Sequence, residues 1–167
     1  MSDLDQVTQQ EISAAKVPHD IFLSNLIMNH ILLFTGIAAF GGHYIKFLAL
    51  VPVLSFIALA VTFYRASKVK REQSEFVYVH WQIARRWSVF FSAVLTLLCT
   101  ISFLGWLGQE YGNMMQEMVY ALIGGLGSLP TLLSVLVLVV IESDSLHHAR
   151  IGTLPKGARK RFLGEED

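Results

Sequence analysis

Histidine is the residue type in this chain best suited to chemistry, because an imidazole binds haem iron or other metals and exchanges protons near neutral pH. There are six histidines, and two of them, His30 and His43, are thirteen residues apart, a spacing that can stack two haems along one helix. His147 and His148 are adjacent rather than four apart, so they do not predict a metal site on one helix face. Two axial ligands must reach one iron at the same level. A haem site therefore depends on how deeply each histidine is placed.

The residue patterns of common catalytic sites do not occur in the sequence. There is no Gly-rich phosphate loop, no nucleophile elbow and no metalloprotease HExxH motif. Cys99 is the only cysteine, and one thiol has neither a disulfide partner nor the spacing of zinc ligands. The acids Glu142 and Asp144 have no evident partner residues for acid–base work. We therefore expect no enzyme activity, no catalytic residue and no bound metal.

Four long segments without a charged residue indicate the fold class. No Asp, Glu, Lys or Arg occurs in residues 21–45, 47–64, 88–109 or 119–141. Each segment is about as long as the ~20 residues that a spanning helix needs, and a helix in a soluble bundle would carry charges on its wet face. The sequence predicts an all-α membrane protein, a bundle of four transmembrane helices at about residues 21–40, 44–64, 87–107 and 118–141.

The basic residues indicate how the chain is threaded. Six Lys and Arg lie in residues 65–86 and five in residues 150–161, whereas the other two connections carry only Lys46 and two glutamates. By the positive-inside rule, the connection between spans 2 and 3 and the C-terminal tail (142–167) are cytoplasmic. Four spans then return the N-terminal tail (1–20) to the same side, and the cell inner membrane is the expected location.

The two tails and the basic connection lead to three local expectations. Asp20 is expected to be the N-cap of span 1, and the N-terminal tail before it is expected to be a loose or peripheral helical segment. Glycines and a proline make helix unexpected in the C-terminal tail. In the basic connection, His80, Arg85 and Arg86 are expected at the cytoplasmic surface.

Span 1 carries the polar residues that lie deepest in the predicted membrane. Asn25 and Asn29 are four apart and share a helix face, with His30 beside them, and polar groups in hydrocarbon usually turn toward neighbouring helices. His30 lies nine residues into the span, about 13 Å from its cytoplasmic edge, whereas His80 is at that edge. The segment VHWQIARRWSVFF around His80 is similar to span starts of b-type cytochromes, but the two histidines do not match in depth. No cofactor is predicted, and haem b on His30 and His80 is kept as an alternative.

Span 4 is rich in small residues before Pro130. The pairs Ala121/Gly125 and Gly124/Ser128 have the small-xxx-small spacing that lets two helix backbones approach closely. These four residues predict a packing face, either inside the bundle or against a partner protein.

The start of the third span resembles a known family. Ser74, Phe76, Val77, His80 and Ala84, after a short charged loop, are similar to a signature of small bacterial four-span proteins related to the chloroplast inner-envelope import component. The pattern covers about a dozen residues and the order of the spans. The resemblance implies a four-helix membrane bundle with His80 at its cytoplasmic mouth, and it assures no activity.

Two classes of function remain open. The first is an accessory or assembly subunit that docks on a larger inner-membrane complex, and we favour it. The alternative is a small-solute channel or carrier, formed by a homo-oligomer around the polar face of span 1. A pathway needs polar residues on several spans at one depth, but outside span 1 the spans offer only hydroxyls, which commonly bond their own helix. A b-type haem subunit ranks third. The expected partners are the lipid bilayer and other membrane subunits or further copies of the chain, and no nucleic acid.

Overall fold

The computed structural model describes residues 7–164, apart from the side chains of residues 42, 43 and 45. Within this part the chain is helical and forms no strand. Four helical stretches are long and apolar enough to cross a membrane, namely Gln9–Phe40, Lys46–Lys68, Glu75–Tyr111 and Gln116–Arg150. The prediction of an all-α, multi-pass membrane protein with four spanning helices is confirmed. The side of the membrane on which each terminus lies stays a prediction.

Three of the four stretches change helix type along their length. The first consists of α1 (Gln9–Ser24), a π-helical segment (Asn25–Leu33) and α2 (Phe34–Phe40). The second has a 3-10 helix (Gly42–Ala49) before α3 (Leu50–Lys68), and the third is the unbroken α4 (Glu75–Tyr111). The fourth consists of α5 (Gln116–Leu122), a π-helical segment (Ile123–Ser128) and α6 (Leu129–Arg150), and a short α7 (Ala158–Leu163) follows it.

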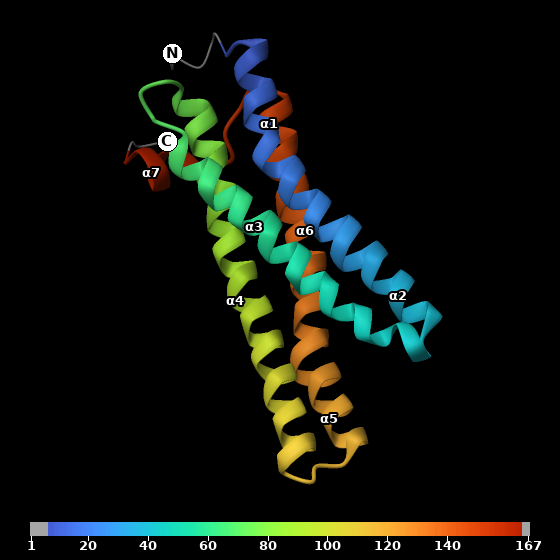
Figure 1. Ribbon diagram of the computed structural model, residues 1–167. Helices are drawn as coiled ribbons and strands as arrows, with labels where there is room; N and C mark the ends of the chain where they lie inside the picture. The colour runs from blue at the N-terminus through green and yellow to red at the C-terminus, as the bar shows by residue number, and fades with distance from the viewer. Residues whose placement is uncertain (1–6, 165–167) are drawn as a thin grey trace.

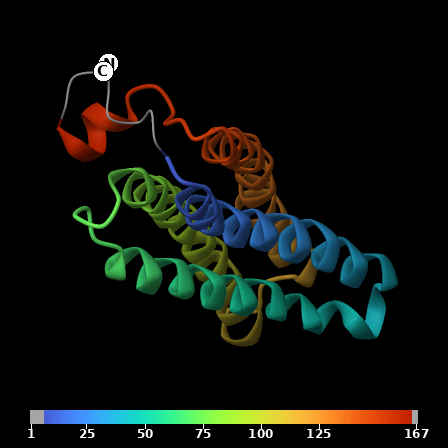
Figure 2. The same ribbon diagram turned by 90° about the horizontal axis from the view of Figure 1, so that it is seen from above.

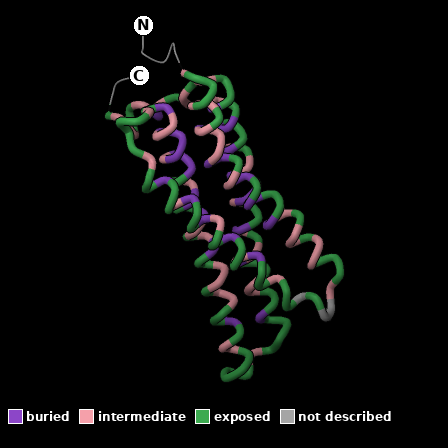
Figure 3. Tube along the Cα trace, turned by 45° about the horizontal axis from the view of Figure 1, so that its top comes forward, coloured by how far each residue is buried: buried purple, intermediate pink, exposed green. Residues whose placement is uncertain are grey.

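The helices form two hairpins that meet at one end of the molecule. Figure 1 shows the hairpin of α1, α2 and α3 crossing the hairpin of α4, α5 and α6, and both described ends of the chain lie at the same end of the bundle. We call this the terminal end, and the opposite end, where the two hairpins diverge, the far end. Figure 2 looks along the bundle and shows α1 lying between α4 and α6. Most of the buried positions in Figure 3 lie toward the terminal end.

The central core is a layer of apolar side chains from all four stretches. Its fully buried members are Phe22, Leu26, Leu59, Phe91, Leu95, Val135 and Leu138. The first, third and fourth stretches each contribute two residues three or four apart, which is the spacing that turns one helix face toward its neighbours, and α3 contributes Leu59.

The first helix begins earlier than its sequence suggested. Thr8 is the N-cap: its hydroxyl accepts a hydrogen bond from the backbone N–H of Glu11 at 3.2 Å, and the Glu11 carboxylate accepts one from the backbone N–H of Thr8 at 2.9 Å. This reciprocal capping box replaces the expected cap at Asp20. Pro18 is buried inside α1. The N-cap expected at Asp20 was wrong, because residues 9–20 belong to the same helix and bury a face, including Ala15, against the other helices.

The third helix also extends beyond its charge-free run. The expected basic connection of residues 65–86 shortens to residues 69–74, and Ser74 caps α4 by accepting a hydrogen bond from the backbone N–H of Val77 at 3.3 Å. The first turns of α4 are helical because Phe76, Val79 and Ile83 are spaced to bury one face.

The C-terminal tail contains helix, contrary to expectation. Helix α6 continues to Arg150, and Gly152 turns the chain with a φ of +71°, a conformation that glycine adopts without strain. The six-residue α7 then folds back onto α4, where Ala158 packs with Val79 and Ile83. Burial of this apolar face outweighs the low helix propensity of the surrounding glycines and proline.

The small residues of the fourth stretch do not form the expected contact inside the bundle. Gly124 and Gly125 are exposed, and a Cβ added to either would meet nothing within 4 Å. The close approach occurs at Gly127, where an added Cβ would lie 2.7 Å from Cδ1 of Leu98. Gly105 of α4 faces Val119 in the same way at 3.0 Å. As a packing face within the bundle, the prediction was therefore wrong for Gly124 and Gly125, because the helix turns them outward.

Candidate functional site

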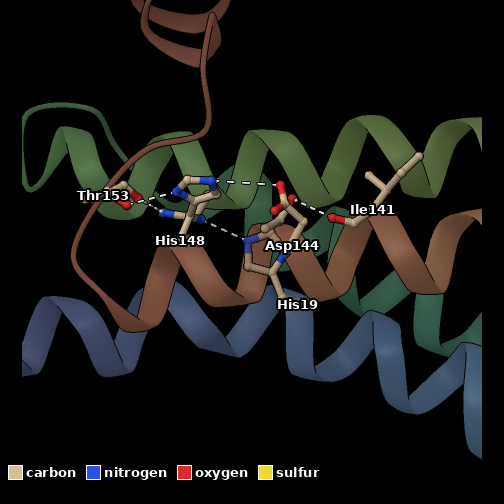
Figure 4. A network of polar contacts seen from close by, with 7 residues as sticks. His19, Ile141, Asp144, His148 and Thr153 are labelled. Atoms are coloured by element: carbon tan, nitrogen blue, oxygen red, sulfur yellow. Dashed lines mark hydrogen bonds and ion pairs between the residues drawn. The ribbon is translucent and has the colours of Figure 1, made fainter.

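A cluster of ionisable side chains lies at the terminal end of the bundle. His19 comes from α1, His80 from α4 and Glu142 from α6. The Nδ1 atom of His19 is 2.6 Å from Oε2 of Glu142, and its Nε2 atom is 2.9 Å from Nδ1 of His80. The Nε2 atom of His80 is 3.3 Å from the backbone carbonyl oxygen of Thr153, in the segment after α6. Figure 4 shows the side chain of His19 directed toward α6 near Asp144. We call His19, His80 and Glu142 the His–Glu cluster.

The protons of the His–Glu cluster follow from its hydrogen bonds. The Thr153 carbonyl can only accept, so Nε2 of His80 carries a hydrogen, and in a neutral His80 the Nδ1 atom must accept. His19 therefore donates from Nε2. Its Nδ1 atom either donates to an ionised Glu142 or accepts from a protonated one. In both cases His19 and Glu142 share one proton, and the pair has no net charge.

The cluster is sealed from solvent. His19, His80 and Glu142 are each 0% exposed, and Oε1 of Glu142 has no hydrogen-bond partner among the described residues. A buried acceptor without a partner costs about 1–3 kcal/mol of stability. The contacts of His19 with Glu142 and His80 oppose this cost by joining α1, α4 and α6 at one point. A substrate has no access to these atoms in this conformation.

Two expectations about these residues were wrong. Glu142 has a partner, His19, and His80 is buried rather than at the surface. Asp144 lies 3.9 Å from Nε2 of His148 on the next turn of α6. The charge-free runs could not reveal the cluster, because its residues lie in the helical extensions beyond those runs. His19 is also 61 positions from His80 and 123 from Glu142 in the sequence. The available signal was the spacing of His19 and Phe22 on one face of α1.

The expected intramembrane polar residues are buried and mostly paired. Asn25 donates to the Ser55 hydroxyl at 2.9 Å, and Asn29 donates to the Val51 carbonyl at 2.8 Å. Both bonds join the first stretch to α3. His30 is 3% exposed and its Nε2 atom has no hydrogen-bond partner among the described residues.

The central core separates the two polar sites. His30 follows His19 by eleven residues, about 16 Å along the helix. Between these levels lie Phe22 and Leu26 of the first stretch, together with Phe91 and Leu95 of α4, all fully buried. Asn25 and Asn29 also lie between these levels, but among the described residues no hydrogen bond joins them to the His–Glu cluster.

Haem ligation by His30 and His80, the alternative to the predicted absence of a cofactor, does not fit this geometry. His80 is at the level of His19, so it is also about 16 Å from His30 along the bundle and cannot share an iron with it. Among residues 7–164, no group of three or more His, Cys, Asp or Glu side chains is arranged to hold a metal ion. Within the His–Glu cluster, the facing nitrogen atoms are already at hydrogen-bond distance from each other.

A cavity of about 420 Å³ opens between the hairpins toward the far end. His30, Val51 and Pro52 line it from the first hairpin, and Leu98, Cys99 and Ser128 from the second. Its wall is largely apolar, and the exposed Gly124 and Gly125 lie in the same π-helical segment as Ser128.

The surface residues expected beside His80 lie further along α4. Arg85 and Arg86 are both exposed, and the guanidinium carbon of Arg86 lies 5.5 Å from the centre of the Trp87 ring.

Comparison with known proteins returned no match to a family model, to a curated protein or to a solved structure. The functional argument therefore rests on the residues and geometry described above.

Proposed function

We propose that this chain is a non-catalytic accessory or assembly subunit that docks, through the outward face of its fourth helical stretch, on a larger complex of the bacterial inner membrane. Both termini and the 69–74 connection face the cytoplasm. The observation that carries the proposal is the exposed Gly124–Gly125 face beside the cavity between the hairpins.

The glycine pair has a cost that the chain itself does not offset. Glycine within a helix destabilises it by about 0.5–1 kcal/mol relative to alanine. Gly127 allows Leu98 to approach, but the Cβ of an alanine at position 124 or 125 would have no described atom of a neighbouring element within 4 Å. In lipid there is no hydrophobic drive between helices, so close van der Waals contact across small residues is a main source of attraction. A helix of another subunit packed on this face would supply that contact.

The cavity between the hairpins is a second argument for docking at the Gly124–Gly125 face. The hairpins diverge at the far end, and their facing sides leave a largely apolar space that Cys99 and His30 line. The Nε2 atom of His30 has no hydrogen-bond partner among the described residues. A partner helix that packs on Gly124 and Gly125 would lie next to Ser128 at the wall of this space.

The alternatives receive less support from the geometry. A channel or carrier needs a polar route along the bundle, but among the described residues no hydrogen bond joins Asn25 and Asn29 to the His–Glu cluster, and Phe22 and Phe91 are fully buried between them. An enzyme needs access to its reactive groups, and the His–Glu cluster is 0% exposed.

The experiment compares three glycine variants after purification from native membranes in a mild detergent. Gly125→Leu should leave thermal stability unchanged and reduce recovery of co-purifying protein or of a homo-oligomer. Gly36→Leu is the matched control, because Gly36 also has open space around its Cβ position but lies in α2. Gly127→Leu should lower stability itself. Equal recovery of partners by the parent and Gly125→Leu would contradict the proposal.

A further inference from the structure

A second cavity, of about 480 Å³, lies between α4, α6 and the C-terminal segment. Three cationic side chains line it: Arg86 from α4, Lys156 from the segment before α7, and Arg161 from α7. All three are exposed, and none is within ion-pair distance of a carboxylate among residues 7–164. Asp144 is the one acid in the wall, and it lies 3.9 Å from His148. The cavity therefore has an excess of positive charge.

The other part of this cavity is apolar and continues into the membrane-facing surface. Trp87, Val140, Ile141 and Phe162 line it, and Val140 is 70% exposed. Residues 88–109 of α4 and 119–141 contain no charged residue, so Trp87 and Ile141 mark the level at which the charge-free surface begins. Tryptophan is enriched at this interfacial level of membrane proteins. The cations thus lie at headgroup height, and Val140 lies toward the acyl chains.

The C-terminal segment is held in position over this cavity. Its Thr153 carbonyl accepts the hydrogen bond of the buried His80, and Ala158 is 5% exposed against α4. The backbone carbonyl of Leu163 accepts a hydrogen bond from Nη1 of Arg71 at 3.3 Å. Lys156 and Arg161 are therefore parts of a formed wall, which distinguishes them from basic residues on a loose tail.

We propose that this cavity binds one anionic phospholipid from the adjacent leaflet. Arg86, Lys156 and Arg161 surround its phosphate, and one acyl chain follows Val140 and Ile141 into the bilayer. Guanidinium and ammonium groups are the usual donors to phosphate oxygens. Three cations and one carboxylate favour a headgroup with net negative charge over a zwitterionic one. The apolar wall distinguishes a lipid from free phosphate, which would use only the cationic part.

The test is native mass spectrometry of the full chain in detergent micelles, titrated with phosphatidylglycerol or with phosphatidylcholine. The parent should retain one phosphatidylglycerol in preference to phosphatidylcholine. The triple variant R86Q/K156Q/R161Q should lose affinity for phosphatidylglycerol by roughly 100-fold, from three basic contacts at a membrane surface. The three positions are exposed, so the variant should fold, and circular dichroism checks this.

A matched triple variant distinguishes a site from general attraction to a basic surface. R65Q/K68Q/K70Q removes the same charge from exposed positions at the end of α3 and in the following connection, outside this cavity. It should keep phosphatidylglycerol affinity within about 3-fold of the parent. Equal losses in the two triple variants, or no loss in R86Q/K156Q/R161Q, would overturn the proposal. Inorganic phosphate that bound as tightly as phosphatidylglycerol would overturn the assignment to lipid.

Discussion

Replacing Glu142 tests how the buried His–Glu cluster holds α1, α4 and α6 together. In Glu142→Ala, the Nδ1 atom of His19 loses the carboxylate that lies 2.6 Å away, and the helices enclose a space where the side chain was. Breaking a buried ion pair by removing one partner costs about 3–5 kcal/mol, because the remaining group stays buried without compensation. We expect a loss of that size in the free energy of unfolding.

Glu142→Gln should be much milder. The His19–Glu142 pair needs one donor and one acceptor across the 2.6 Å contact, and the glutamine amide can donate to Nδ1 of a neutral His19. His19 then still donates from Nε2 to His80. The cost should be about 1 kcal/mol, the typical net value of one hydrogen bond.

The assay is equilibrium unfolding in mixed micelles, followed by far-ultraviolet circular dichroism. Glu142→Ala, His19→Ala and the double variant form a double-mutant cycle, and contacting residues of this kind usually couple by about 0.5–3 kcal/mol. If the two single losses added within about 0.5 kcal/mol, the residues would not act as a pair. If Glu142→Gln cost as much as Glu142→Ala, the shared-proton description would be incorrect, because a neutral donor would not replace the carboxyl group.

Three further predictions address the rest of the molecule. Reporter fusions after Arg71, after Gly112 and at the C-terminus should give cytoplasmic, external and cytoplasmic signals, because basic connections resist translocation. An external C-terminus would refute the four-span threading. Purified protein should lack a haem Soret band, and a stoichiometric b-type spectrum that His30→Ala abolished would make electron transfer the leading function. Gly127→Leu should lower the free energy of unfolding by about 1–3 kcal/mol through overpacking against Leu98, whereas an equal loss in Gly125→Leu would contradict the outward placement of that residue.

The sequence predicted the number of spanning helices because charge is the property that hydrocarbon excludes most strongly. It misplaced the helix ends because a charge-free run ends at the first charged residue. Beyond that residue the helix continues, with one face buried against its neighbours. Helix α4 starts at Glu75, twelve residues before the expected span, and Arg85 and Arg86 lie exposed on one face of it. Val79 and Ile83, in the turns just before these arginines, are buried and pack under α7.

Sequence analysis predicted some of the buried polar residues and missed others. Asn25 and Asn29 were expected to face other helices from their depth and spacing, and the structure buries both. The His19–Glu142 pair joins positions 123 residues apart, and no local pattern gives the rotation of α1 relative to α6 that brings them together. The outward rotation of Gly124 and Gly125 depends in the same way on how the fourth stretch packs, with Gly127 on its inner side.

The most direct test of the proposed docking face is photocrosslinking in intact native membranes. A crosslinking amino acid at position 125 would lie on the exposed face of the fourth stretch, and the same residue at Gly36 would report on α2 in open surroundings. The proposal predicts a discrete protein adduct from position 125, either another subunit or a second copy of the chain, and none from position 36. Lipid adducts alone at position 125, with no protein adduct, would contradict it.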